Sequence, residues 1–257
     1  ANQAQGDSAT LGNSYESVTS TRVLFGGYTA HYRSQEPGGL TPRNTDSIID
    51  DDIVIDQPSE ELLLNVDTIE VAGQFTVNGT PAPVSAYEYA RISLLNPKTG
   101  AATELGNTFS QSYLQMRIIP GDYDLLYEHR EGDTLPQNRE TVFAKNVSIT
   151  TDGSFDIDIP VVNFSASFTL NGEAFPLSAY DYAAIYINES GVDTGDEYGL
   201  DFGDSFDGIH EINLLPGQYD LVYRVRESAF IVPVNQRMRF ISSLEVLAST
   251  HISHDFI

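Results

Sequence analysis

The sequence predicts an all-β chain of tandem antiparallel β-sandwich modules that follow an N-terminal extra half module. Three observations predict it: a long internal repeat, apolar residues that alternate with polar ones, and closely spaced turn residues. FTVNGTPAPVSAYEYARISLLN, which starts at Phe75, matches FTLNGEAFPLSAYDYAAIYINE, which starts at Phe168, at an offset of 168 minus 75, or 93 residues. A match of this length indicates one structural unit made twice.

A fainter copy of half the unit lies upstream. FGGYTAHYRSQEPGGLTPRN, residues 25–44, parallels PGDYDLLYEHREGDTLPQN from Pro120 and keeps its two tyrosines four residues apart. LLLNVDTIEVAGQFTVNG from Leu62 likewise matches FDIDIPVVNFSASFTLNG from Phe155. The alignments divide the chain into an arm and half module, the candidate strand donor (1–60), a first sandwich module (61–154) and a second (155–257).

Within each copy the apolar residues alternate with polar ones, as on a strand with one wet face. Tyr123, Leu125 and Tyr127 fall on one face of such a strand. Asn78-Gly79 and Asn171-Gly172 follow strands and supply the positive φ that tight hairpin turns require. The segment SAYEYARISLL is the best helical candidate, but its β-rich second part predicts a short turn followed by a strand.

The order of these signals resembles a known family. VNG-x-P-x-P, a β segment, a short turn and then PG-x-Y at the start of an alternating strand resemble the carboxypeptidase regulatory-like or transthyretin-like β-sandwich, an immunoglobulin-like architecture. The resemblance covers both full copies, from about Leu62 onward. The copies are also similar to tandem repeats of exported proteins of Gram-negative bacteria, which implies a secreted, extracellular or cell-surface location. The family has no active site that could be carried over to this chain.

Composition excludes several classes of function. The 257 residues carry 37 Asp and Glu against 13 Lys and Arg, a formal net charge of −24, which repels nucleic acid and anionic lipid surfaces. Without cysteine the chain has neither disulfides nor thiolate metal sites. No apolar run approaches the roughly 18 residues that span a bilayer. We therefore expect no nucleic-acid partner and no membrane span.

Short motifs of enzymes lie in the wrong context. Gly203-Asp204-Ser205 followed by Asp207 and His210 imitates the blocks of GDS-type esterases. A serine nucleophile needs a strand-to-helix turn beside a base, and the sequence lacks the alternating helices of that fold. The sequence therefore predicts that the protein is not an enzyme.

Acidic and aromatic clusters are the candidate ligand sites. Closely spaced carboxylates are the hard oxygen ligands that calcium prefers, although a solvated acidic surface is the simpler explanation. The calcium candidates are Asp193, Asp196, Glu197, Asp201, Asp204 and Asp207, and a second acidic segment holds Asp46, Asp50, Asp51, Asp52 and Asp56. Apart from calcium, no cofactor is expected. The tyrosines that could contact a ligand such as a polysaccharide are Tyr87, Tyr89, Tyr180 and Tyr182.

The half module is the most suggestive functional feature. Half a sandwich leaves an apolar face and backbone hydrogen-bonding groups uncovered, so this segment should lie on an edge of the neighbouring sandwich or pair with another molecule. The candidate assembly residues are Val23, Leu24, Phe25, Tyr28 and Tyr32. We therefore expect a self-assembling extracellular filament or matrix subunit that uses strand addition. The alternative is a monomeric carbohydrate-binding or adhesion module.

Overall fold

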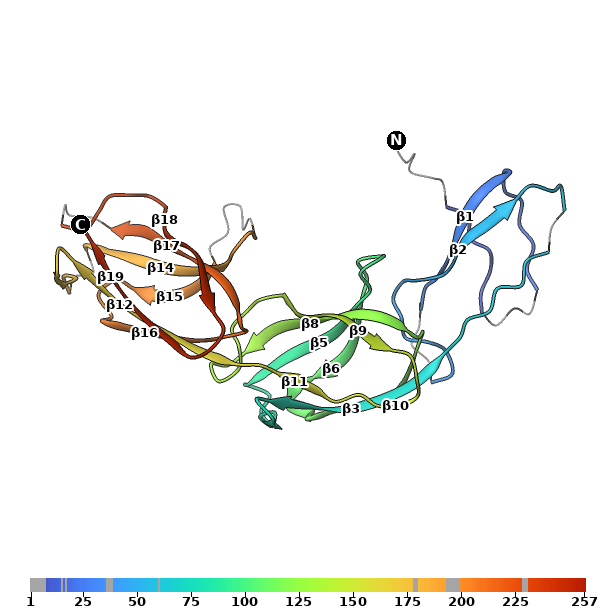
Figure 1. Cartoon of the computed structure of the whole chain (residues 1–257), viewed down its shortest axis with the longest axis horizontal. Coiled ribbons are helices and arrows are strands. Elements are labelled where there is room, and N and C mark those ends of the chain that lie inside the picture. Colours follow the sequence, from blue (N-terminus) through green and yellow to red (C-terminus); the bar gives the residue numbers. More distant parts are fainter. Residues whose placement is uncertain are drawn as a thin grey trace.

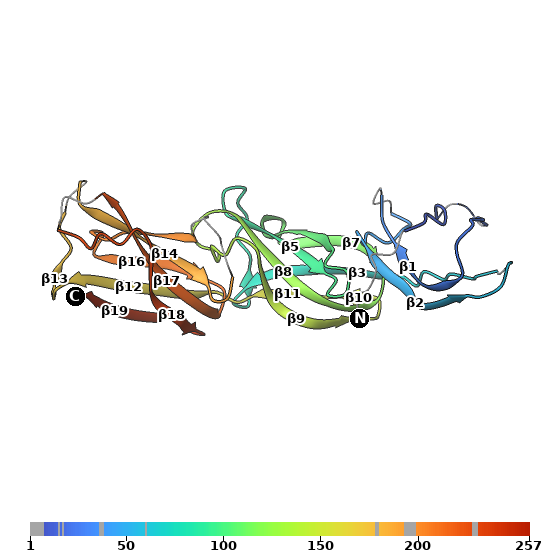
Figure 2. The same ribbon diagram turned by 90° about the horizontal axis from the view of Figure 1, so that it is seen from above.

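The computed structural model describes residues 8–14, 16, 18–35, 39–59, 61–177, 180–192, 199–227 and 231–257. In these residues the regular secondary structure consists of β-strands and one 3-10 turn, without an α-helix, which confirms the predicted fold class. Figure 1 shows three β bodies in a row, with β1 and β2 at one end of the long axis and β17 to β19 at the other. The view from above in Figure 2 confirms this order.

The first module packs two sheets around one core. Its strands are β3 (Ile69–Val77), β4 (Thr80–Pro81), β5 (Tyr89–Leu95), β6 (Ala102–Asn107), β7 (Ser112–Ile118), β8 (Gly121–Glu131), β9 (Thr141–Ile149), β10 (Gly153–Ser154) and β11 (Ile157–Ile159), with a 3-10 turn at Thr108–Ser110. One sheet joins β3 to β4, β7, β10 and β11, and the other has the order β6-β5-β8-β9. Phe75, Ile92 and Tyr127 are fully buried between them.

The second module repeats this plan. Its strands are β12 (Val162–Leu170), β13 (Glu173–Ala174), β14 (Tyr182–Glu189), β15 (Leu200–Asp204), β16 (Ile209–Leu214), β17 (Gly217–Glu227), β18 (Met238–Val246) and β19 (Thr250–Phe256). One sheet joins β12 to β13, β16 and β19, and the other has the order β15-β14-β17-β18. Phe164, Ile185 and Tyr223 occupy its core.

The hairpin turns follow the sequence prediction. Asn78 and Gly79 have φ of 47° and 76°, and Asn171 and Gly172 have φ of 53° and 79°. Positive φ at both central residues matches the right-handed twist of the flanking strands. The segment SAYEYARISLL also forms a turn and then β5, as expected.

Each module closes with a parallel strand pair, which a purely antiparallel prediction misses. β10 and β11 pair in parallel with β3, and β19 pairs in parallel with β12. The pair is parallel because the chain leaves β9 in one sheet, crosses to the other sheet, and there runs beside the first strand of the module in the same direction. Ile157 and Ile159 lie in the first core, so the predicted boundary between residues 154 and 155 falls inside the strand segment that closes the first module.

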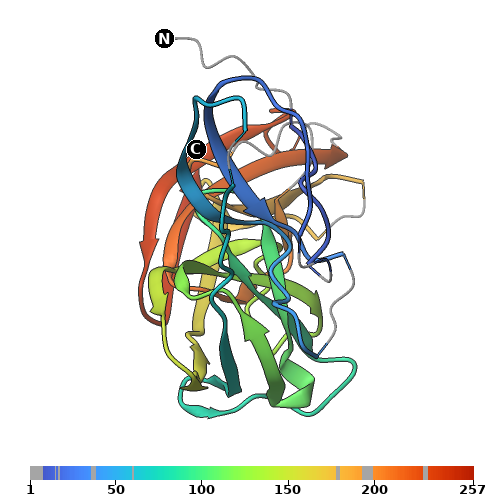
Figure 3. The same ribbon diagram turned by 90° about the vertical axis from the view of Figure 1, so that its right-hand side faces the viewer.

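The N-terminal body is a two-stranded sheet of β1 (Gly26–Tyr32) and β2 (Ser47–Ile55). Figure 3, seen along the long axis, shows this hairpin in front of the modules. In the alignment of the repeats, β1 corresponds to β8 of the first module and β17 of the second. Each of these two strands lies between two other strands of its sheet. In the described residues, β1 pairs with β2 alone. The half module therefore extends neither sheet of its neighbour, unlike the first arrangement expected from the sequence.

Candidate functional site: the asparagine junctions

Each of the three bodies carries the same loop, which we call the Pro-x-Asn loop. Its members are Pro42-Arg43-Asn44, Pro136-Gln137-Asn138 and Pro233-Val234-Asn235. Two hydrogen bonds hold each loop in one shape. A tyrosine hydroxyl donates to the proline carbonyl, at 3.0 Å from Tyr32, 2.6 Å from Tyr127 and 2.8 Å from Tyr223. A backbone amide donates to the asparagine carbonyl, at 3.0 Å from Ser34 and 3.2 Å from His129 and from Val225.

Asn44 fastens the half module to the first module. Its Nδ2 donates to the Tyr123 hydroxyl at 2.8 Å, and its Oδ1 accepts the backbone amide of Ile119 at 2.7 Å. The Tyr123 hydroxyl in turn donates to the Ile119 carbonyl at 2.5 Å. Asn44 is only 1% exposed, so its amide group is satisfied entirely by this pocket rather than by water.

Asn138 makes the same junction between the two full modules. Its Nδ2 donates to the Tyr219 hydroxyl at 2.9 Å, and its Oδ1 accepts the backbone amide of Leu215 at 2.8 Å. The Tyr219 hydroxyl donates to the Leu215 carbonyl at 2.5 Å. A further bond joins Asn138 Nδ2 to Glu189 Oε1 at 2.8 Å. Asn138 is completely buried.

The two junctions also share a backbone contact and an apolar one. The amide of Arg43 donates to the Arg117 carbonyl at 2.9 Å, and the amide of Gln137 donates to the Asn213 carbonyl at 2.9 Å. The Leu215 side chain belongs to the buried cluster of the first module although it lies in the second. We use the name asparagine receptor for the groups that bind each asparagine side chain. They are a backbone amide, of Ile119 or Leu215, and a tyrosine hydroxyl, of Tyr123 or Tyr219.

The receptor tyrosine must be a neutral phenol, because it donates one hydrogen bond and accepts another. Burial raises the pKa of Tyr123, while the hydrogen bond from Asn44 acts in the opposite direction with less effect. Burial likewise raises the pKa of Tyr219. Both hydroxyls therefore keep their protons at neutral pH, as the junction requires.

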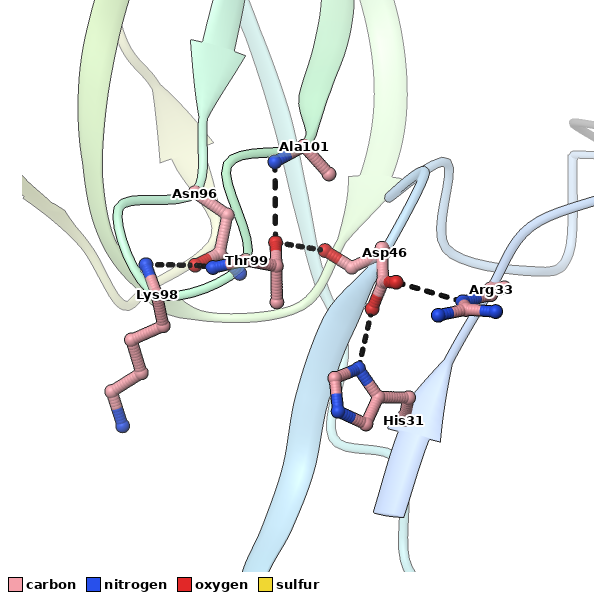
Figure 4. A network of polar contacts seen from close by, with 7 residues as sticks. All are labelled: His31, Arg33, Asp46, Asn96, Lys98, Thr99 and Ala101. Carbon is pink, nitrogen blue, oxygen red and sulfur yellow. Dashed lines mark hydrogen bonds and ion pairs between the residues drawn. The ribbon is translucent and has the colours of Figure 1, made fainter. Parts of the chain in front are cut away.

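A polar network reinforces the first junction (Figure 4). The Asp46 carboxylate bonds to His31 Nδ1 and to Arg33 Nε, both at 2.7 Å, and the Asp46 carbonyl accepts from Thr99 Oγ1 at 3.2 Å. Burial alone would raise the pKa of Asp46, but the bonds from His31 and Arg33 outweigh it and lower the pKa. The Asp46 carboxylate, predicted from the sequence as part of an acidic ligand segment, therefore stabilises the half module itself, and the Asp46 backbone carbonyl links the half module to the first module.

The predicted assembly residues differ in exposure. Leu24 is 83% exposed and Phe25 is also exposed, whereas Val23, Tyr28 and Tyr32 are half-buried. The Tyr28 hydroxyl donates to the Leu24 carbonyl at 2.5 Å. The same bond from a tyrosine hydroxyl to a backbone carbonyl occurs within both asparagine receptors, from Tyr123 to Ile119 and from Tyr219 to Leu215.

The predicted tyrosine sites divide into two kinds. Tyr87 and Tyr180, at equivalent places in the two modules, are 79% and 76% exposed. Tyr89 and Tyr182 are half-buried, and each packs edge-on against a phenylalanine ring with centroids 5.6 Å apart. The structure thus leaves one tyrosine of each pair on the surface.

The predicted calcium cluster lies partly outside the described residues, which exclude Asp193, Asp196 and Glu197. The carboxylates of Asp201 and Asp207 accept backbone amides of Gly203 and Asp204 at 3.0 and 2.8 Å. Burial, followed by repulsion from Asp207 and Asp201, raises the pKa of Asp204. The described part of the chain holds no group of three His, Cys, Asp or Glu arranged to bind a metal, and calcium stays a prediction.

The serine and histidine of the esterase-like motif have structural partners. Ser205 Oγ accepts the backbone amide of Ala183 at 3.1 Å, and Thr108 makes the same bond at the equivalent place in the first module. His210 Nδ1 bonds to the Phe202 carbonyl at 2.8 Å. Both residues are buried, so this arrangement serves packing within the second module.

The segments that end in Asn44 and Asn138 align in the sequence, but the alignment gives these asparagines no role. The signal that could have found the three asparagines is the recurrence of Pro-x-Asn 9 or 10 residues after each tyrosine pair. A polar residue kept at the same place in three copies is a candidate for a repeated contact.

Among the described residues, the structure has no helix with the length and hydrophobicity needed to cross a membrane.

Comparison with known proteins shows distant likenesses only. No protein-family model matches the sequence, and no curated protein matches it. The Bacillus anthracis TIE protein is 15% identical with a TM-score of 0.27, and the match covers 88% of this chain and 41% of that one. A streptococcal ancillary pilin is 10% identical with a TM-score of 0.27, covering 91% of this chain and 76% of that one.

A leucine-rich repeat protein from Bacteroides thetaiotaomicron is 10% identical with a TM-score of 0.24, covering 74% of this chain and 26% of that one. This chain therefore spans less than half the length of that protein and of the TIE protein. With TM-scores this low, no residue role or function is transferred from these proteins.

Proposed function

We propose that this chain is an extracellular structural protein of a bacterial surface that assembles with copies of itself into a filament or matrix. The observation that carries the proposal is the half module. Within the described part of the chain its strand β1 pairs on one edge only, whereas the counterparts β8 and β17 pair on both edges. An open edge presents a row of backbone donors and acceptors to which another chain adds a strand.

The junctions support the same function. Because Asn44 and Asn138 are buried and bonded on both sides, they fix neighbouring bodies relative to one another. The result is an elongated array of modules (Figure 2), a shape suited to spacing and connecting rather than to enclosing a substrate. The acidic surface keeps such an array soluble outside the cell.

Strand addition at β1 is tested by changing its open edge. Thr29 is exposed in β1, and its counterpart Asp124 pairs with Leu95 of β5 on the side that is open in the half module. Thr29→Pro removes the backbone donor there, and Thr29→Ala is the matched control that keeps it. Light scattering and electron microscopy should show assemblies for wild type and Thr29→Ala, and fewer or shorter ones for Thr29→Pro. Equal assembly of all three would exclude strand addition at this edge.

A second candidate function is adhesion through carbohydrate binding, favoured by the exposure of Tyr87 and Tyr180 at equivalent places. Flat aromatic rings stack on sugar rings, and a pair on a rigid array could contact two places along one polysaccharide. Glycan-array binding should be lost in the double variant Tyr87→Ala with Tyr180→Ala. It should persist when the half-buried Tyr89 is changed to Phe, because the ring remains.

A further inference from the structure

We propose that copies of this chain join end to end, with Asn235 of one copy seated in the asparagine receptor formed by Leu24 and Tyr28 of the next. The inference rests on the proposed function and names the contact that would propagate the assembly. It requires no added strand, because it reuses the junction that the chain already makes twice internally.

The last Pro-x-Asn loop has the shape of the two that are engaged. The Tyr223 hydroxyl donates to the Pro233 carbonyl at 2.8 Å, and the Val225 amide donates to the Asn235 carbonyl at 3.2 Å. Asn235 is nevertheless exposed, unlike Asn44 and Asn138. The loop is thus ordered before it binds, which lowers the entropy cost of binding.

The first receptor also has the geometry of the two that are engaged. Tyr28 donates to the Leu24 carbonyl at 2.5 Å, the distance found for Tyr123 with Ile119 and for Tyr219 with Leu215. By repeat alignment, the Leu24 amide would donate to Asn235 Oδ1, and the Tyr28 hydroxyl would accept from Asn235 Nδ2. Among the described residues, no hydrogen bond occupies the Leu24 amide or the Asn235 side chain.

The apolar part of the junction is matched as well. Leu215 is 1% exposed because it belongs to the buried cluster of the preceding module, which also contains Leu135. Its counterpart Leu24 is 83% exposed, and among the described residues it belongs to no buried cluster. The counterpart of Leu135 is Val232, which is buried in the core of the second module, but its neighbours Ile231 and Val234 are 61% and 67% exposed. The exposed Leu24 of one copy can therefore pack against these exposed apolar side chains of another copy.

The two surfaces lie in the terminal bodies of the row, β1 and β2 at one end and β17 and β18 at the other (Figure 1). A contact between two different surfaces at opposite ends does not close on itself and propagates into a chain of copies. The net charge of −24 opposes this association, so screening by salt should strengthen it.

Complementary variants test the proposal on the full chain by sedimentation velocity over a range of concentrations, at low and high salt. Asn235→Ala removes the amide group, Tyr28→Phe removes the receptor hydroxyl, and Gln236→Ala is the exposed neighbouring control. Wild type and Gln236→Ala should form a concentration-dependent series of oligomers that grows with salt. Asn235→Ala and Tyr28→Phe should each remain monomeric.

The decisive sample is an equal mixture of Asn235→Ala and Tyr28→Phe. It has one intact Asn235 and one intact receptor per pair, so it should form dimers and nothing larger. If the wild type associates but both variants associate equally well, this inference is overturned while assembly by strand addition stands. If the wild type stays monomeric under all conditions, the proposed function fails together with the inference.

Discussion

Replacing Asn138 by alanine should uncouple the two full modules. The change leaves the backbone amide of Leu215, now donating to Asn138 Oδ1 at 2.8 Å, without its buried acceptor, at a cost of about 1–3 kcal/mol. It also removes the donor to the Glu189 carboxylate at 2.8 Å, and hydrogen bonds to charged groups contribute about 1.5–3 kcal/mol. Because water can enter the space and the two losses overlap, we expect a total of about 3 kcal/mol.

The assay is urea unfolding of the full chain, followed by small-angle X-ray scattering under native conditions. Each full module has its own core, so the loss should separate one cooperative transition into two and broaden the distribution of module orientations. Asn235→Ala is the matched control, since it is the same residue in the same loop but exposed, and all variants are compared at a protein concentration at which the wild type is monomeric. It should change unfolding by less than about 0.5 kcal/mol. Equal effects of the two substitutions would refute the role of the junction.

Two further results are expected. Gly73→Ala should destabilise the first module by about 3 kcal/mol, because a Cβ at Gly73 would lie 2.1 Å from the backbone carbonyl oxygen of Phe155. An unchanged midpoint for the thermal unfolding of the first module would contradict this expectation. The half module itself should lose stability in acid, because the Asp46 carboxylate bonds to His31 and Arg33 within it and its folded-state pKa lies below the ordinary 3.8, so the stabilisation is complete above that value and is lost as pH falls through the lower one. Chemical shifts of the half module should report this loss, and Asp46→Asn, which cannot be deprotonated to pair with His31 and Arg33, should show a destabilised half module at every pH.

The modular plan could be predicted from the sequence because each of its signals is local. Two-residue alternation specifies strands, and Asn-Gly at Asn78 and Asn171 specifies the hairpin turns that the structure contains. The repeat then shows that one fold occurs twice and that half of it occurs once more. None of these steps depends on where one module lies relative to another.

The candidate site depended on contacts that no local pattern contains. Asn44 and Tyr123 are 79 residues apart, and Asn138 and Tyr219 are 81 residues apart. An exposed asparagine in a turn and a buried one in a neighbour's receptor look identical in sequence, as Asn235 and Asn138 do. Only packing distinguishes them.

What the sequence alone determined is the β-sandwich unit, its number of copies and the half copy that precedes them, because strand period and turn chemistry act between near neighbours in the chain. The tertiary structure alone decided the parallel closing strands, the end-on docking of the half module and the burial of Asn44 and Asn138. These features arise where distant segments meet, and there the cost of burying an amide without partners favours an arrangement in which Asn44 and Asn138 have hydrogen-bond partners.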